Sequence, residues 1–160
     1  MGGKSKPSGR ATDDKVYCGG LGEYYPHEVF HVQIDPHFPN RHFWASEGVA
    51  TLLGGSRGRS LDWHIKRTSH YLKQRPEIDL NNMLNLRALD GETSFHYVLG
   101  GLIAKKVFEK GSWSLLKELM SSGETDEAYY KAMHELLGIK RGEINNYIRE
   151  QLELESQKFQ

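Results

Sequence analysis

The sequence predicts a mainly α-helical fold, α+β at most, with a short or missing β segment near its N-terminal end. Three observations favour this class. Apolar residues recur at helical spacing through most of the chain, as at Leu61, Ile65 and Leu72. Before the first expected helix, only residues 16–18, Val-Tyr-Cys, have the β-branched and aromatic character of a strand. The length of 160 residues suffices for one substantial hydrophobic core but not for two.

Capping residues and helix breakers divide the chain into the expected helices. Pro26 suits the first turn of a helix, because its missing N–H has no partner there. Pro36 disfavours helix beyond about residue 34. Capping hydroxyls such as Ser60, together with glycines and prolines, delimit the other helices. These are predicted at 44–53, 61–73, 79–89, 94–109, 112–120, 126–137 and 142–154.

Two of these helices carry features that predict their packing. Gly100 and Gly101 lie inside the helix for which Thr93 is the predicted cap. Each glycine costs a helix interior about 1 kcal/mol relative to alanine. We therefore expect close packing against the helices of the functional site to compensate. Met83 stands among leucines at helical spacing and is predicted to lie in the core.

The N-terminal region predicts little regular structure. Residues 1–15 are rich in Gly, Ser, Lys and Asp and lack apolar periodicity, which indicates a flexible segment before a single domain at 16–155. The glycines of residues 19–22 lack the Lys-Ser/Thr pair of a phosphate loop. They are expected to let the chain pass close to the functional cleft or turn into the first helix. Because so little strand precedes that helix, we expect the chain to be a fragment of a longer protein.

Composition excludes several classes of partner. Acidic and basic residues balance at 21 each, so no global field favours nucleic acid or an anionic membrane. No run of about 18 apolar residues is present, so insertion into a membrane is not expected, and the N-terminus lacks the apolar core of a signal peptide. Cys18 is the single cysteine and has no partner for an internal disulfide. Composition leaves the oligomeric state open.

The motif that carries chemistry is HEVFH at residues 27–31, an HExxH sequence. On a helix His27 and His31 lie one turn apart on the same face, so both can bind one metal ion. Glu28 then lies beside the ion without being a ligand. A carboxylate in that position can take a proton from a zinc-bound water. The motif therefore predicts a zinc site with Glu28 as the general base.

Two residues compete to be the third protein ligand. His37 gives a spacing that resembles the metzincin peptidases, but their sharp turn needs glycine where this chain has Ile34. A β-branched residue is a poor occupant of such a turn. Glu47 follows His31 by sixteen residues, enough for a loop and a returning helix. We expect Glu47 to be the ligand, with His37 and His42 as loop histidines near the cleft.

HEVFH followed by WASEGVA at residues 44–50 resembles the gluzincin zinc metallopeptidases, in particular the peptidase-MA-like group related to the zinc aminopeptidases. In that group HExxH is followed on a second helix by WxxEGxA. The resemblance implies a gluzincin-like helical domain that binds one Zn²⁺ per chain through His27, His31 and Glu47, with Glu28 as the base. Gluzincin domains usually place a small sheet before HExxH, and this sequence departs from that pattern.

A further resemblance concerns the oxyanion of the tetrahedral intermediate. Tyr97-Val98-Leu99-Gly100 is similar to the YxxG start of a helix in the zinc aminopeptidases, whose tyrosine stabilises that oxyanion. The resemblance implies this role for Tyr97. His96 is the alternative, because thermolysin-like gluzincins use a histidine. Both side chains can donate a hydrogen bond to developing negative charge.

The expected function is zinc-dependent hydrolysis of peptide bonds in a peptide or protein substrate. Two alternatives stay open: a catalytically inactive zinc-binding domain that binds protein or glycan, and a structural helical module in which the motif is accidental. Internal cleavage is favoured, because Glu23 is too close to the motif to stand in for an exopeptidase signature. Analogy with exported relatives favours an extracytoplasmic location.

Overall fold

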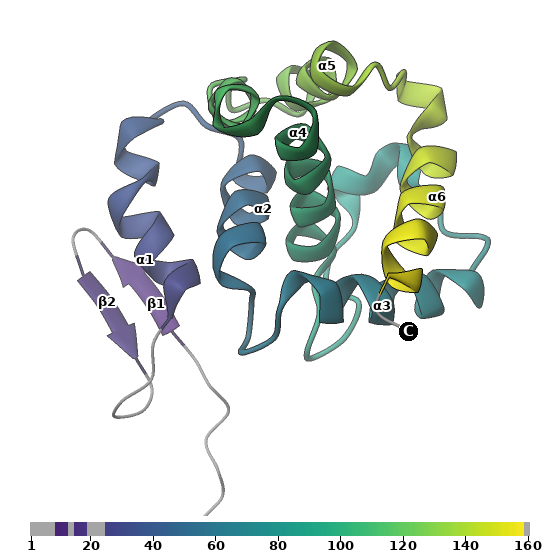
Figure 1. Cartoon of the computed structure of the whole chain (residues 1–160), viewed down its shortest axis with the longest axis horizontal. Helices are drawn as coiled ribbons and strands as arrows, with labels where there is room; N and C mark the ends of the chain where they lie inside the picture. The colour runs from purple at the N-terminus through teal and green to yellow at the C-terminus, as the bar shows by residue number, and fades with distance from the viewer. Residues whose placement is uncertain (1–8, 13–14, 19–24, 159–160) are drawn as a thin grey trace, which may run out of the picture.

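The computed structural model describes residues 9–12, 15–18 and 25–158. The described chain is mainly helical, which confirms the predicted fold class (Figure 1). None of the described helices combines the length and apolar character that crossing a bilayer requires. The glycines of residues 19–22 and Glu23 lie outside the described residues. The structure therefore does not test the expected course of the chain at 19–22 or the argument based on Glu23.

The observed helices lie close to the predicted ones. Those at 61–73 and 126–137 have the predicted bounds, because Ser60 and Thr125 cap them through side-chain oxygens. The α-helices are α1 (Pro26–Gln33), α2 (Phe43–Gly54), α3 (Leu61–Lys73), α4 (Phe95–Met120), α5 (Asp126–Leu137) and α6 (Ile144–Gln157). Shorter 3₁₀ helices are η1 (Asp35–His37), η2 (Leu80–Asn85) and η3 (Arg141–Glu143).

Three details differ from the prediction. The segment expected as a helix at 79–89 is the 3₁₀ helix η2. The helices expected at 94–109 and 112–120 form one element, α4, with a kink where Gly111 and Ser112 leave helical dihedral angles. Thr93 does not cap α4: Ser94 occupies the N-cap position, and the Thr93 hydroxyl instead pairs with Nδ1 of the buried His64 at 3.1 Å.

Two short strands precede α1. β1 (Gly9–Thr12) and β2 (Lys15–Cys18) pair antiparallel, with Gly9 opposite Cys18. β2 contains the strand predicted at 16–18, but the prediction that residues 1–15 lack regular structure is wrong for β1. A four-residue strand depends on backbone hydrogen bonds with its partner, which composition does not reveal. Both strands contact α1, the helix of the HExxH motif (Figure 1).

Helices α2 and α4 pack backbone against backbone. A Cβ added at Gly48 would lie 2.4 Å from the carbonyl carbon of Gly100, and one added at Gly100 would lie 2.7 Å from the carbonyl oxygen of Trp44. Only glycine permits this distance, which confirms the close packing expected at Gly100. The contact fixes α2, and with it Glu47, relative to the first turn of α4.

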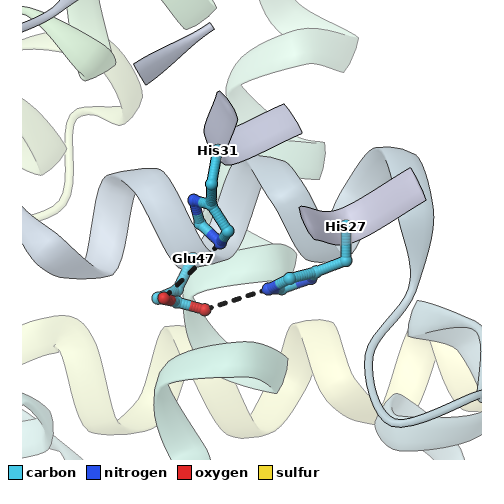
Figure 2. A group of neighbouring side chains, drawn as sticks. All are labelled: His27, His31 and Glu47. Carbon is cyan, nitrogen blue, oxygen red and sulfur yellow. Dashed lines mark hydrogen bonds and ion pairs between the residues drawn. The ribbon is translucent and has the colours of Figure 1, made fainter. Parts of the chain in front are cut away.

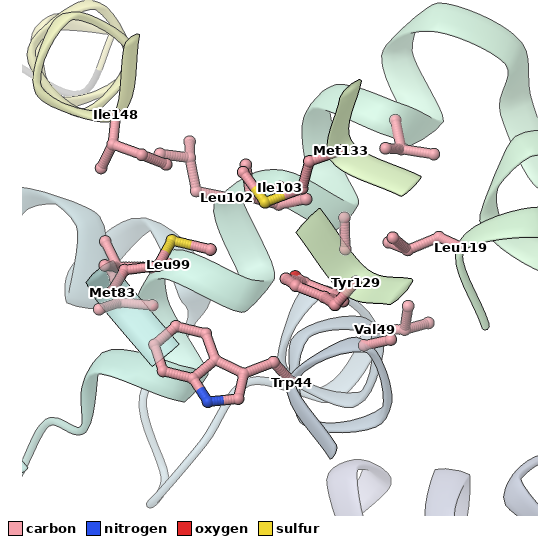
Figure 3. Packing of buried hydrophobic residues seen from close by; sticks show 14 of the residues in the cluster. Trp44, Val49, Met83, Leu99, Leu102, Ile103, Leu119, Tyr129, Met133 and Ile148 are labelled. Atoms are coloured by element: carbon pink, nitrogen blue, oxygen red, sulfur yellow. The ribbon is translucent and has the colours of Figure 1, made fainter. Parts of the chain in front are cut away.

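An apolar core surrounds α4 and holds the other helices around it (Figure 3). Met83 is fully buried there, as predicted. Trp44 and Val49 insert into this core from α2, so rotation of α2 about its axis would expose both. The buried residues labelled in Figure 3 are Trp44, Val49, Met83, Leu99, Leu102, Ile103, Leu119, Tyr129, Met133 and Ile148.

Candidate metal centre

Three side chains from two helices converge on one point (Figure 2). His27 and His31 come from consecutive turns of α1, and Glu47 comes from α2. Nε2 of His27 lies 3.1 Å from Oε2 of Glu47, and Nε2 of His31 lies 3.6 Å from Oε1. One ligand atom from each residue lies within 4.8 Å of the other two, so the group could hold a metal ion.

The two nitrogen-to-oxygen distances in this group are close to the distance between two ligands of a tetrahedral ion. Nitrogen and oxygen ligands lie about 2.0–2.2 Å from Zn²⁺, so two ligands of a tetrahedral site are about 3.3 Å apart. The two nitrogen-to-oxygen distances of 3.1 and 3.6 Å fall on either side of that value. Two imidazoles and one carboxylate are also the protein ligands of many catalytic zinc sites, which leave the fourth position to water.

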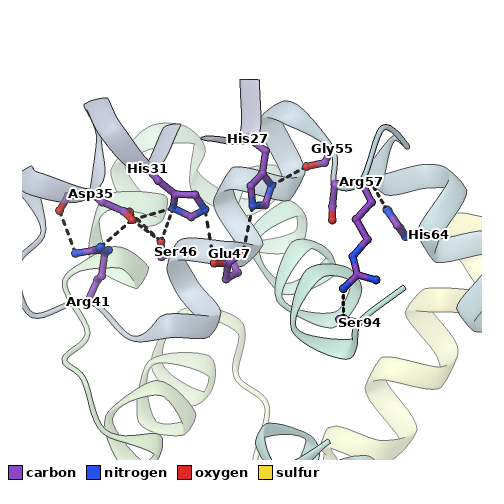
Figure 4. Close-up of polar contacts among 11 residues, drawn as sticks. His27, His31, Asp35, Arg41, Ser46, Glu47, Gly55, Arg57, His64 and Ser94 are labelled. Atoms are coloured by element: carbon purple, nitrogen blue, oxygen red, sulfur yellow. Dashed lines mark hydrogen bonds and ion pairs between the residues drawn. The ribbon is translucent and has the colours of Figure 1, made fainter. Parts of the chain in front are cut away.

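The other ring nitrogen of each histidine has its own acceptor (Figure 4). Nδ1 of His27 lies 2.7 Å from the carbonyl oxygen of Gly55, and Nδ1 of His31 lies 2.8 Å from Oδ2 of Asp35. These acceptors hold the ring proton on Nδ1. Nε2 of each ring then faces Glu47, and loss of the Nε2 proton on metal binding would leave the tautomer that a metal ligand needs.

Asp35 is the centre of a buried polar network behind His31. Its carboxylate accepts hydrogen bonds from the Ser46 hydroxyl at 2.9 Å and from Nη2 of Arg41 at 2.8 Å. Nη1 of Arg41 also donates to the carbonyl oxygens of Asp35 and Phe38. The bonds immobilise the carboxylate that orients the imidazole of His31.

The sequence analysis did not identify Asp35, Ser46 or Arg41. The available signal was an acidic residue four positions after His31, which is one helical turn. Because Pro36 predicts that the helix ends near residue 34, the sequence did not indicate that Asp35 would lie one helical turn after His31. In the structure Ile34 keeps right-handed helical angles and η1 continues the turn, which brings Asp35 under His31.

The electrostatics of the centre favour positive charge. Burial opposes protonation of His31, but the hydrogen bonds and charges of Asp35 and Glu47 outweigh it and raise the pKa of His31 to about 9. Burial also opposes ionisation of Glu47, but hydrogen bonds with both histidines lower its pKa to about 2. Glu47 is therefore an anion across the physiological pH range, as a ligand carboxylate must be.

The structure places the other predicted catalytic residues around this group. Glu28 follows His27 on α1 and is half-buried. The ring of Tyr97, in the first turn of α4, meets the ring of His27 edge to face, with centroids 5.5 Å apart. The ring of His96 lies against those of Tyr97 and Phe43, with centroids 4.2 and 5.1 Å away.

Burial shifts the pKa values of Tyr97 and His96, the two candidate oxyanion donors, in opposite directions. Burial and the negative charge of Glu47 raise the pKa of Tyr97, so its hydroxyl remains a hydrogen-bond donor at neutral pH. Burial lowers the pKa of His96, so its imidazole is neutral there and can donate from one nitrogen only. Both side chains can therefore donate one hydrogen bond at neutral pH, and the contact with His27 favours Tyr97.

His37 and His42 lie outside the group. His37 is exposed at the end of η1 and is not among the residues that converge with His27 and His31. His42 is not a loop histidine beside the cleft: it is the buried N-cap of α2, where Nδ1 accepts from the backbone N–H of Trp44 at 3.2 Å. Its Nε2 pairs with Asp126, which ties α2 to α5.

Comparison of the chain with protein-family models, with curated proteins and with solved structures found no match. The chemistry of the centre is the remaining guide to function. Its elements are two imidazoles, one ionised carboxylate, a neighbouring glutamate and a protonated tyrosine.

Proposed function

We propose that this protein is a zinc metallopeptidase of the gluzincin type, a hydrolase in which His27, His31 and Glu47 hold one Zn²⁺. The observation that carries the proposal is the convergence of these residues with both imidazole Nδ1 atoms bound to other acceptors. A solvated helix face has no reason to orient two imidazoles in this way. The resemblance of HExxH and WxxEGxA to the gluzincin motifs supports the same assignment.

When bound, the ion would supply a Lewis acid for the substrate carbonyl and lower the pKa of a water molecule to about 7. Glu28 accepts the proton of the attacking water and delivers it to the leaving amine. Tyr97, or His96 in its place, donates a hydrogen bond to the oxyanion. Asp35 and the Gly55 carbonyl keep the two imidazoles in the orientation that binding requires.

The test combines zinc content with hydrolysis of a peptide library. We expect one zinc per chain in the wild type and in Glu28→Gln, and loss of zinc in Glu47→Ala. Of these three proteins, only the wild type should cleave peptides, because Glu28→Gln removes the base and leaves the ligands intact, and Glu47→Ala loses the zinc. Glu124→Ala is the matched control, since Glu124 is exposed and outside the centre.

Each other outcome contradicts a defined part of the proposal. Zinc retained in Glu47→Ala would show that Glu47 is not the third ligand. Zinc without hydrolysis in the wild type would favour an inactive zinc-binding domain that binds protein or glycan. Absence of zinc from every variant would leave a structural helical module.

A further inference from the structure

The turn between α2 and α3 joins the metal centre to an arginine (Figure 4). The Gly55 carbonyl in this turn accepts the hydrogen bond from His27. Two backbone hydrogen bonds between Ser56 and Arg59, at 2.8 and 2.9 Å, close the turn. Between them Arg57 has a φ of 50°, in the left-handed region that few non-glycine residues adopt. The turn therefore holds a proposed metal ligand and presents Arg57 from the same short segment.

Neighbours on two sides hold the guanidinium of Arg57. Nη1 donates to the Gly91 carbonyl at 2.7 Å, and Nη2 donates to the Ser94 hydroxyl at 3.3 Å. The guanidinium carbon lies 5.6 Å from the centre of the Tyr97 ring, within the range of a cation–π contact. Since the Tyr97 ring also contacts His27, Arg57 lies on the His27 side of the metal centre.

The positive charge of Arg57 has no carboxylate partner in the described part of the chain. Both of its hydrogen bonds go to neutral oxygens, whereas Arg41 and Arg67 form ion pairs with Asp35 and Asp90. Arg57 is also exposed to solvent. A guanidinium has five N–H donors, so two bonds leave others for a ligand.

We propose that Arg57 is a carboxylate-binding subsite for the peptide substrate. An oriented guanidinium binds a carboxylate through two parallel hydrogen bonds, which gives both affinity and direction. Peptides carry such a group at the C-terminus and on acidic side chains. The identity of the ligand as a peptide rests on the proposed peptidase function, whereas the preference for a carboxylate rests on Arg57 and its surroundings.

The alternative role for Arg57 is to adjust the pKa of Tyr97, the proposed oxyanion donor. The guanidinium opposes the rise that burial causes in the pKa of Tyr97, so its removal could alter the oxyanion donor. That role affects every substrate equally and lowers kcat. A carboxylate subsite affects only substrates that carry the carboxylate and raises their KM. The two roles therefore predict different measurements.

The test measures binding without turnover. The reference protein is Glu28→Gln supplied with Zn²⁺, compared with the same protein carrying Arg57→Ala or Arg59→Ala. Arg59 is the matched control, because it is exposed in the same turn and its guanidinium lies over Trp63, away from Tyr97. The probes are dansyl-labelled tetra-alanine as the free acid, as the amide, and as an amide in which one alanine is replaced by glutamate, because the dansyl group carries no carboxylate. Fluorescence polarisation gives the affinities, and thermal unfolding shows that each variant is folded.

We expect Arg57→Ala to weaken binding of a carboxylate-bearing probe about 10–100-fold, the usual effect of losing a hydrogen bond to a charged group. The amide probe and the Arg59→Ala protein should be unaffected. Loss for the free acid alone identifies the C-terminal carboxylate, and loss for the glutamate probe alone identifies an acidic side chain. Equal affinity of the reference protein for all three probes, or equal loss for all three, overturns the subsite.

The two proposals fail in different ways. Arg57-dependent binding of a carboxylate by a wild-type protein that cleaves no peptide would refute the peptidase function and leave the subsite standing. Cleavage by the wild type, with kcat and KM unchanged in Arg57→Ala, would refute the subsite alone.

Discussion

The Asp35 carboxylate lies 2.8 Å from Nδ1 of His31, and Ser46 and Arg41 hold it there. The pair determines which nitrogen of His31 faces Glu47. Ligand histidines commonly donate their second ring N–H to a carboxylate, which raises their basicity and fixes the ring. Asp35 therefore belongs to the candidate metal centre without being one of its ligands.

Asp35→Ala is expected to weaken zinc binding about 10–100-fold, because the His31 ring loses its orienting acceptor. Competition against a chelator of known affinity measures this change. Arg41→Ala, which removes one support of Asp35 but leaves its carboxylate, should have a smaller effect. Unchanged zinc affinity in a folded Asp35→Ala protein would show that Asp35 does not position His31.

Tyr97→Phe is expected to lower kcat about 10²–10³-fold, as loss of an oxyanion donor does in other hydrolases, and to leave the zinc content unchanged. The matched variant is His96→Asn, since His96 is the neighbouring residue and its ring lies against that of Tyr97. Steady-state kinetics on the best peptide of the library measures both. The reverse result, a large loss in His96→Asn and none in Tyr97→Phe, would assign the role to His96.

Gly48→Ala is expected to reduce the free energy of unfolding by about 2 kcal/mol, because its Cβ would clash with the backbone of Gly100. Urea unfolding gives the value. In Gly142→Ala the added Cβ meets nothing within 4 Å, so that control should change stability by less than about 0.5 kcal/mol. Equal stability of the two variants would contradict the close packing of α2 against α4.

Glu155 makes stability depend on acid pH. Burial raises the pKa of a carboxyl, but hydrogen bonds from Lys105, Lys106 and Lys158 outweigh it and lower the pKa of Glu155 to about 2, from an ordinary value of 4.5. Because the pKa is lower in the folded protein, ionised Glu155 stabilises the fold above about pH 4.5. This contribution is lost as the pH falls towards 2.

Glu155→Gln should therefore lower the free energy of unfolding at pH 7 by about 3 kcal/mol, since it removes the ion pairs with Lys105 and Lys106 that lower the pKa of Glu155. It should also flatten the decline in stability between pH 5 and about pH 3. Chemical unfolding at a series of pH values tests both effects. Glu150→Gln is the control, because Glu150 is exposed on the same helix. Parallel pH profiles for wild type and Glu155→Gln would contradict the assignment.

Local chemistry within the sequence was enough to predict the fold class and most helices. Ser60 supplies a cap, Pro26 starts α1, and apolar spacing marks the buried faces. Each of these signals lies within a few residues of the helix end or the buried helix face that it determines. The same holds for His27 and His31, whose shared face follows from helix geometry alone.

Contacts between distant segments were decided only by the tertiary structure. The 3₁₀ form of η2 and the bond from His27 to the Gly55 carbonyl depend on which segments pack together. Arg57 and Ser94 are 37 positions apart and meet because the turn after α2 lies beside the start of α4. No local pattern encodes such contacts, because their free energy comes from packing and hydrogen bonds that exist only once the helices have assembled.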